Sequence, residues 1–222
     1  MVDLKPEDNS IQENYYVIKG KNYPRMTRVL SIISKPEFYR WYANNGYQKC
    51  QNVMNTRAAF GTRVHHEIEN HLQGKECWVD SSEMKDTLES FYKWNIKHKL
   101  QPIDLEKTLH NDDLCLAGTA DYVGYFTPSR QKPWGKGNEV KVLLDWKTSK
   151  AVFDNYHLQV AGYMFMYEQQ TGVRLDGCGV VSFRDGSIHQ KFFTRDEAMK
   201  LIPVLRGAIE LYNWKFKEGN WI

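Results

Sequence analysis

Two opposite charges inside a short apolar run constrain the fold of this chain more than any other feature. The run covers residues 142–149 and places Asp145 and Lys147 two positions apart. Alternate residues of a β-strand share one face, so both charged side chains project from the same side of the predicted strand, away from Leu144 and Trp146. A buried charge is costly unless something such as a metal ion or a phosphate compensates for it. This strand is therefore expected to border a binding site.

The composition is that of a globular protein. Of the 222 residues, 41% are hydrophobic and 26% are charged, which is enough for one large domain. No apolar run approaches the roughly 18 residues that span a bilayer. The acidic start over residues 1–8 is neither a secretory signal nor an Arg-rich transit peptide. We therefore expect a cytoplasmic protein without membrane contact, with a flexible tail over residues 1–14 and a single domain over 15–222.

The four cysteines are widely spaced and include no Cys-x-x-Cys pair. They are Cys50, Cys77, Cys115 and Cys178. This pattern argues against a zinc ribbon or an iron–sulfur cluster, both of which need closely spaced thiols, and favours reduced, mostly buried thiols.

Basic and aromatic residues are concentrated in residues 19–63. This segment holds nine lysines and arginines and a single acid, Glu37, although the whole chain carries only +3. Cations that pair with phosphates and rings that stack on bases are typical of a surface that binds single-stranded nucleic acid. The same composition also suits a solvated helical face above an aromatic core. We expect residues 23–60 to form a basic, arch-like helical subregion. The candidate DNA-binding residues are Arg25, Thr27, Arg28, Arg40, Trp41, Arg63 and Lys150.

The hydrophobic period changes along the chain, which predicts an α/β fold. Helical spacing dominates residues 26–99, strand alternation dominates 103–147, and a helix, a hairpin and a last helix follow. We expect a mixed β-sheet flanked by helices, with an N-terminal helical region. The expected strands are 15–18, 103–110, 114–126, 139–147, 177–183 and 188–193. The expected helices include one from Pro36 to Gly46, one over 57–72 and one over 154–172. A further helix is expected to be capped by Asp80, with the apolar stripe Leu88, Phe91, Tyr92 and Ile96. The last helix is expected to begin at the capping box of Thr194 and Glu197 and to bend at Pro203.

Carboxylates on two neighbouring strands suggest a divalent-cation site. Asp121 lies on the strand expected to pair antiparallel with that of Asp145, so the two carboxylates can converge on one Mg²⁺ or Mn²⁺ ion. A single carboxylate on a strand is more often exposed. An imidazole from His65 could complete the ligands, with Glu69 on the same helical face to support it. The neighbouring histidines have HExxxH rather than HExxH spacing, which excludes a zinc-protease motif.

Lys147 has a chemical role available beside two metal-bound carboxylates. Its ammonium could orient or deprotonate an attacking water and stabilise the charge of a phosphoryl transition state. The alternative is a purely structural ion pair with Asp121. Gln159 and Tyr163 share a helical face directly after this strand, where they could contact a scissile phosphate or hold Lys147 in place. A half-buried polar face without a function fits that pair equally well.

Four short motifs occur in order along the chain. They are Gly-Thr-x-x-His65, Gly-Thr-x-Asp121, Asp145-Trp-Lys147 and Gln159-x-x-x-Tyr163. Together with residues 26–30, 144–149 and 158–163, they resemble the PD-(D/E)XK nuclease superfamily, in its RecB-like exonuclease branch. Within that branch the sequence is most similar to the mitochondrial genome maintenance exonuclease group and its phage and bacterial relatives. The resemblance covers residues 23–217.

The resemblance implies a restriction-endonuclease-like core and a role for each motif. The metal ligands would be His65, Asp121, Asp145 and the backbone carbonyl of Trp146, and the catalytic lysine would be Lys147. In the family an N-terminal helical region forms an arch or channel for a single strand, which fits the basic segment. This sequence lacks the C-terminal cysteine cluster of the iron–sulfur members and the transit peptide of the mitochondrial members. A bacterial, phage or viral origin is therefore expected.

The resemblance implies a metal-dependent DNA exonuclease that acts on single-stranded ends and leaves 5′-phosphates. Its expected cofactor is Mg²⁺ or Mn²⁺, without an iron–sulfur cluster. Its expected partners are single-stranded DNA with a free end and proteins of replication or recombination, and we expect a monomer. Two alternatives stay open. One is a non-catalytic DNA-binding or recombination accessory protein, which the intact Asp-x-Lys pair disfavours, and the other is a structure-selective endonuclease of the same fold.

Overall fold

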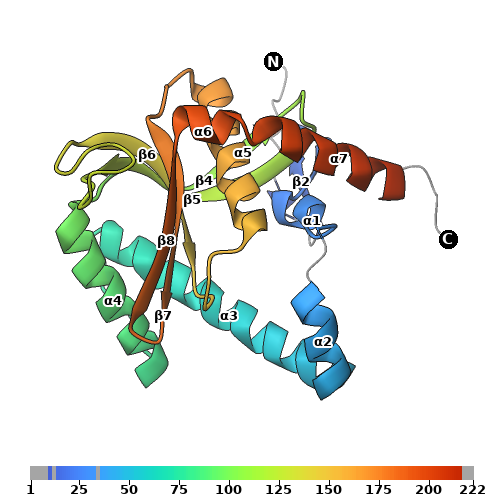
Figure 1. The fold of residues 1–222 in the computed structure, drawn as a ribbon, viewed down its shortest axis with the longest axis horizontal. Helices are drawn as coiled ribbons and strands as arrows, with labels where there is room; N and C mark the ends of the chain where they lie inside the picture. The colour runs from blue at the N-terminus through green and yellow to red at the C-terminus, as the bar shows by residue number, and fades with distance from the viewer. Residues whose placement is uncertain (1–9, 12–13, 34–35, 217–222) are drawn as a thin grey trace, which may run out of the picture.

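A mixed β-sheet forms the centre of the computed structural model, which describes residues 10–11, 14–33 and 36–216 (Figure 1). Within these residues the sheet has five strands in the order β4-β5-β6-β7-β8. Their bounds are β4 (Gln101–Asn111), β5 (Leu116–Phe126), β6 (Val140–Lys147), β7 (Gly177–Arg184) and β8 (Ser187–Thr194). All neighbours are antiparallel except β6 and β7, which run parallel and are joined through helix α5 (Asp154–Thr171). The expected mixed sheet is confirmed, and its strands lie within two residues of their expected bounds.

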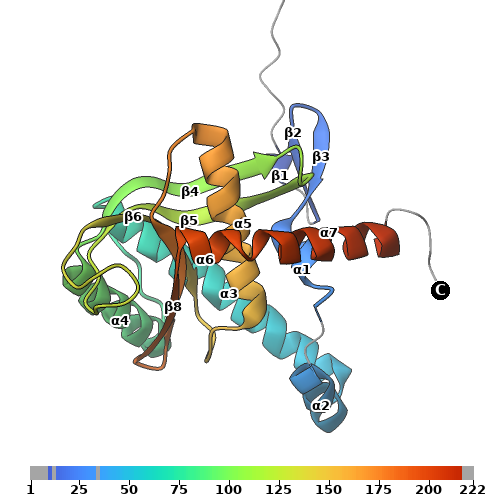
Figure 2. The same cartoon turned by 45° about the horizontal axis from the view of Figure 1, so that its top comes forward.

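Helices cover both faces of this sheet (Figures 1 and 2). The first face carries α5, α1 (Met26–Leu30), α6 (Arg195–Met199) and α7 (Ile202–Phe216), and the second carries α3 (Tyr47–Leu72) and α4 (Ser82–His98). The apolar core is divided in the same way, because Leu143 of β6 packs with α5 whereas Leu144 and Trp146 pack with α3 and α4. This alternation turns Asp145 and Lys147 toward the α5 side of the sheet.

Helix α5 packs closely against both α1 and α7. Its residues 158–164 are all buried. Gly162 permits this packing, because a Cβ there would lie 2.4 Å from Cε of Met26 and 2.7 Å from Cδ2 of Leu205. A larger residue at position 162 would push α1 or α7 away from the sheet, so this glycine sets how close the N-terminal region can come to the central strands.

The N-terminal region is part strand and part helix. Tyr15–Ile18 forms strand β2 as expected, but it belongs to a small antiparallel sheet with β1 (Ser10–Ile11) and β3 (Lys21–Pro24). The expected flexible tail therefore contains a strand at residues 10–11. Its residues 1–9 and 12–13 lie outside the described part of the chain.

A helical hairpin, formed by α2 (Pro36–Asn45) and the first half of α3, extends away from the sheet (Figure 2). Gly46 separates the two helices with a φ of 78°, a left-handed conformation that favours glycine. The ring of Tyr42 stacks on that of Tyr47, with the ring centroids 5.9 Å apart. α3 has 26 residues and begins ten residues before the helix expected at position 57. Neither α3 nor any other helix in the described residues is long and apolar enough to cross a membrane.

Helix α4 differs from its expected form at two places. Its N-cap is Ser81, whose hydroxyl accepts a hydrogen bond from the Met84 N–H at 3.3 Å, because Asp80 instead pairs with Arg63 at 2.8 Å. Ile96, expected in the apolar stripe, is 78% exposed, and Trp94 is buried instead. The buried stripe follows alternating three- and four-residue steps, and the turn of 3.6 residues carries position 96 out of it.

The last expected helix is two helices. Thr194 and Glu197 form the expected capping box at the start of α6. The chain then leaves the helical path after Met199, and α7 begins at Ile202. Pro203 is the second residue of α7, where a missing N–H leaves no helical carbonyl unpaired. The proline therefore starts a new helix instead of bending an old one.

Candidate active site

Strands β5 and β6 separate where the two candidate carboxylates stand. The last pair of their ladder joins Tyr122 to Leu144, and Asp121 and Asp145 follow directly beyond it. In place of a backbone carbonyl, Oδ2 of Asp121 accepts a hydrogen bond from the Trp146 N–H at 2.6 Å. β6 continues to pair with β7 up to its end. The gap therefore opens on the β5 side, with both carboxylates at its border.

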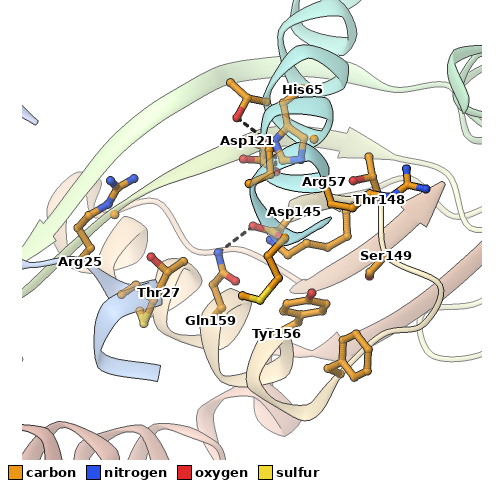
Figure 3. A pocket seen from close by; sticks show the side chains of 18 of the residues that line it. Arg25, Thr27, Arg57, His65, Asp121, Asp145, Thr148, Ser149, Tyr156 and Gln159 are labelled. Carbon is orange, nitrogen blue, oxygen red and sulfur yellow. Dashed lines mark hydrogen bonds and ion pairs between the residues drawn. The ribbon is translucent and has the colours of Figure 1, made fainter. Parts of the chain in front are cut away.

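Asp145 is held from two sides inside the core, and only 1% of it is exposed. Its Oδ1 accepts a hydrogen bond from Nε2 of Gln159 at 3.1 Å, drawn as a dashed line in Figure 3. Its Oδ2 contacts the ammonium of Lys147 but accepts no well-aligned hydrogen bond from the described residues. The charge of this oxygen thus depends on a neighbouring cation.

Gln159 and Tyr163 support this arrangement from α5. Nε2 of Gln159 also donates to the Tyr163 hydroxyl at 3.2 Å. The Tyr163 ring lies over Gly118, where a Cβ would come within 2.4 Å of Cε1. Burial raises the pKa of Tyr163 well above its ordinary value, so the phenol stays neutral. The geometry gives this pair a role that was not expected, the orientation of Asp145, while contact with a scissile phosphate or with Lys147 stays a prediction.

A second cluster joins three elements around Asp121. Nδ1 of His65, from α3, lies 3.4 Å from Oδ2 of Asp121. Although burial disfavours a charged ring, the Asp121 carboxylate raises the pKa of His65. Glu106 of β4 completes the cluster, and one ligand atom of each of the three residues lies within 4.8 Å of the others. Glu69, expected as a support, instead accepts a hydrogen bond from Gln73 at 2.8 Å.

Glu106 has no place in the expected motifs. The hairpin pairs Leu105 with Tyr122 and Lys107 with Ala120, which puts Glu106 opposite Asp121. Counting the register outward from the turn at residues 112–115 would have found it. Glu106 is open to solvent on one side, but partial burial and the nearby Asp121 raise its pKa to about 7. It is therefore a rim carboxylate whose charge depends on a nearby cation.

The pKa values of the charged groups at the gap are shifted in different directions. Burial raises the pKa of Asp145 to about 6 against the pull of Lys147, and the neighbouring Asp121 adds to the rise. For Asp121, burial is outweighed by His65 and Lys147, so its pKa is lowered. For Lys147, burial is outweighed by the two carboxylates, so its pKa is raised. Lys147 is therefore an ammonium near neutral pH. The structural alternative, an ion pair with Asp121, is replaced by contact with Asp145.

A cavity of about 860 Å³ opens above these residues, between the helical hairpin, α1, α5 and the gap in the sheet (Figure 3). Three of the expected DNA-binding residues line it, namely Arg25, Thr27 and Trp41. Arg57 and Tyr156 are among the lining residues that were not expected. Arg57 stands two helical turns before His65, and the ring centroid of Tyr156 lies 4.9 Å from Nζ of Lys147. The i, i+4, i+8 spacing of Arg57 to His65 could have revealed the first.

The other four expected DNA-binding residues do not line this cavity. The Arg28 guanidinium lies 5.5 Å from the ring centroid of Phe216, and Arg63 is paired with Asp80. Arg40 is exposed on α2, and Lys150 lines a different cavity. Position in the basic segment therefore did not predict which cations reach the site.

The donors around Asp121 suit a divalent cation. Carboxylate oxygens are typical ligands of Mg²⁺ and Mn²⁺, and an imidazole nitrogen is a common ligand of divalent transition metals. Asp145 is not among the three groups within 4.8 Å of one another, since its carboxylate turns toward Gln159 and Lys147. The Trp146 peptide lies next to the cluster through its hydrogen bond to Asp121. These residues thus fit a divalent cation, and they suit more than one metal.

No protein-family model matches this sequence, and no curated protein matches it. Among solved structures, the fold is similar to that of SSO0001, with a TM-score of 0.40 and 14% identity over 95% of this chain and 85% of that one. It is also similar to LHK-Exo, an alkaline exonuclease from Laribacter hongkongensis, with a TM-score of 0.33 and 13% identity over 88% of this chain and 94% of that one. LHK-Exo in complex with dAMP gives a TM-score of 0.30 at 13% identity over the same shares. The similarity is distant, so function has to be inferred from the site residues themselves.

Proposed function

We propose that this protein is a metal-dependent DNA exonuclease of the PD-(D/E)XK superfamily, in its RecB-like branch, which acts on single-stranded ends and leaves 5′-phosphates. The observation that carries the proposal is the buried contact between Asp145 and Lys147 beside the His65–Asp121 pair. A protein that only bound DNA would gain nothing from buried carboxylates facing the phosphates it attracts. Hydrolysis needs such groups, because they can gather a cation, a water and a phosphate.

Lys147 would supply a fixed positive charge at the reaction centre. Although burial opposes it, the two carboxylates raise the pKa of Lys147, so the ammonium can donate hydrogen bonds but cannot accept a proton near neutral pH. As the water oxygen bonds to phosphorus, negative charge grows on the phosphate oxygens and the ammonium stabilises it. The attacking water releases a proton to solvent, the P–O3′ bond breaks, O3′ takes a proton from solvent, and the phosphate remains on the 5′ oxygen.

The proposed cation ligands are His65, Asp121, Asp145 and the Trp146 carbonyl, with Mg²⁺ or Mn²⁺ as the cation. When bound, such a cation lowers the pKa of a coordinated water and neutralises phosphate charge. The hydrogen bonds from Gln159 to Asp145 and from the Trp146 N–H to Asp121 hold both carboxylates in fixed orientations. Ligands oriented in this way lose less freedom when the cation binds.

The lining of the cavity supports a single strand as substrate. Arg25 can meet phosphates, as can Arg57, which also pairs with Glu83 at 2.5 Å, while the rings of Trp41 and Tyr156 can stack on bases. The helical hairpin forms one wall, and we assign to it the arch-like role expected for residues 23–60. The proposal includes one nuclease domain over residues 15–222, acting as a cytoplasmic monomer alongside replication or recombination proteins.

The decisive experiment compares linear with circular single strands, labelled at either end, in Mg²⁺ and in Mn²⁺. The expected result is stepwise shortening of the linear strand, with 5′-phosphate products and an intact circle. Cutting of the circle would replace the exonuclease with a structure-selective endonuclease. Tight binding in EDTA without cutting in either metal would identify a DNA-binding accessory protein instead.

A further inference from the structure

A second cavity, of about 720 Å³, lies between α4, β8 and the chain that follows the catalytic strand. Five lysines and arginines and three histidines line it, and none of its described lining residues is acidic. The basic residues are Lys93, Lys97, Arg130, Lys150 and Lys191, and the histidines are His98, His157 and His189. We call this cavity the basic groove.

The cations of the basic groove come from four separate segments, so their proximity is a product of the fold. They lie on α4, on the connection after β5, on the loop after β6 and on β8. Burial lowers the pKa of His157, and Lys191 on β8 adds to this effect, whereas Asp154 on the same helix as His157 opposes it. Glu89 contacts Lys93 at 3.9 Å and Asp154 contacts His157 at 3.7 Å, both from outside the lining. The groove as a whole therefore keeps a positive charge suited to a polyanion.

The basic groove and the active-site cavity share one loop as their common wall. Thr148 and Ser149 line the active-site cavity, and Lys150 and the two residues after it line the groove. Ser182 donates to the Ser149 carbonyl at 2.6 Å, which ties the loop to β7. The chain from Lys147 to Lys150 is three residues long and spans at most about 10 Å. This distance equals roughly three nucleotides of one DNA strand, at about 3.4 Å for each nucleotide. The groove therefore begins within a few nucleotides of the scissile phosphate.

The groove offers charge but few rings for stacking. Trp94 is buried, and its Nε1 donates to Oε1 of Gln190 at 2.8 Å. The ring of His98 lies flat against Phe126, with the ring centroids 4.7 Å apart. Both rings are thus occupied within the protein. A surface of this kind can contact phosphates, which carry no sequence information, and leaves base recognition to the active-site cavity.

We propose that the basic groove binds the phosphate backbone of the DNA that continues beyond the scissile phosphate, an inference that rests on the proposed nuclease function. Its exposed cations neutralise successive phosphates and so keep the substrate attached between cuts. Because such contacts release counterions, they should appear directly in the salt dependence of binding.

The test is a triple variant, Lys97→Gln, Arg130→Gln and Lys191→Gln, with a matched control, Lys75→Gln, Lys85→Gln and Lys200→Gln. The control removes the same charge from exposed positions that line no described cavity. Binding of a labelled single strand is measured in EDTA over a series of KCl concentrations. Each lost phosphate contact lowers the slope of log affinity against log salt by about 0.7, so the groove triple should lose about 2 and the control close to zero. The single variant Lys97→Gln should lose about 0.7, in case the triple variant folds poorly.

Equal slopes for the groove triple and the control would overturn the inference. So would complete displacement of the DNA by inorganic phosphate at constant ionic strength, because that result would make the groove a small-anion site. The measurement needs no cleavage. If the protein cuts DNA but the groove triple leaves the salt slope unchanged, only the role proposed for the groove is wrong. If the groove triple lowers the salt slope but the protein never cuts DNA, only the proposed catalysis is wrong.

Discussion

The active-site cavity and the basic groove lie on either side of the loop at residues 148–152 and use charge in opposite ways. The active-site cavity places acids and cations together around the buried Asp121 and Asp145, with Asp145 and Lys147 in direct contact. The basic groove collects cations alone and leaves its lysines exposed. Opposed buried charges are costly to hold but can distinguish a transition state from a ground state. Exposed charges of one sign cost little and can only attract.

This difference predicts that substitutions in the two places separate chemistry from attachment. The largest effects are expected at the buried contact. Asp145→Ala and Lys147→Ala should each lower Mg²⁺-dependent cleavage by about 10³-fold or more, because each removes a preorganised charge from the reaction centre. Cleavage is measured on an end-labelled single strand, and the thermal unfolding midpoint shows whether the fold is intact. Retained activity in a clean preparation of either variant would end the nuclease assignment.

The hydrogen bond from Gln159 to Asp145 is expected to matter next most. Gln159→Leu should raise the Mg²⁺ concentration for half-maximal cleavage by about 10–100-fold, because groups that orient metal ligands contribute effects of that size. The rate at saturating metal should change less. Gln169→Leu, at an exposed position of the same helix, is the matched control. Equal metal dependence in the two variants would show that Gln159 does not position Asp145.

Glu106 is expected to have a smaller effect because it stands at the rim of the site. Glu106→Gln should raise the Mg²⁺ concentration for half-maximal cleavage by about 10-fold, at the low end of the range for residues that tune a metal site. Glu76→Gln, at an exposed position outside both cavities, is the control. An unchanged metal titration in Glu106→Gln would remove this carboxylate from the ligand set.

The smallest predicted effect is on stability and concerns the floor of the basic groove. Burial lowers the pKa of His98 below 6.5, and its Nδ1 is bonded to the Thr127 carbonyl at 2.8 Å. The unfolded chain therefore binds a proton at His98 before the folded protein does. The contribution of His98 to the free energy of unfolding is full above pH 6.5 and is lost as the pH falls toward the folded value.

Urea denaturation on both sides of pH 6.5 measures this effect. In His98→Gln the loss of stability on acidification should be shallower than in the parent protein. His66→Gln, at an exposed position, should follow the parent protein. Parallel acid profiles for His98→Gln and the parent would show that His98 titrates normally in the folded protein.

Local pattern in the sequence was sufficient for much of this molecule. Alternation predicted that Asp145 and Lys147 face one way and Trp146 the other, and the central sheet has its expected strands. Helical spacing predicted that Gln159 and Tyr163 share a face, and they are hydrogen-bonded at 3.2 Å. These features depend on residues a few positions apart, for which the strand and helix periods hold regardless of the rest of the chain.

Features that join distant segments were missed. Glu106 reaches Asp121 only through the register of a hairpin, and the ion pair of Arg63 with Asp80 was not predicted. The DNA-binding role expected for Lys150 stays a prediction, but its neighbours in the basic groove come from four other segments, which the sequence pattern did not bring together. The partner of a long, charged side chain depends on how helices and strands pack, and that information is not contained in any local period.

The sequence thus specified which strand would carry the reactive pair, because burying two charges on one strand face restricts what can surround them. Packing specified what does surround them. The early end of the β5–β6 ladder opens the gap between Asp121 and Asp145, and the approach of α3 brings His65 to its border. The loop after β6 then divides one cavity with charges of both signs from another that the described residues line with positive charges alone. The gap, the position of His65 and the division of the two cavities each depend on contacts between residues far apart in the chain. Burial and strand register decide those contacts.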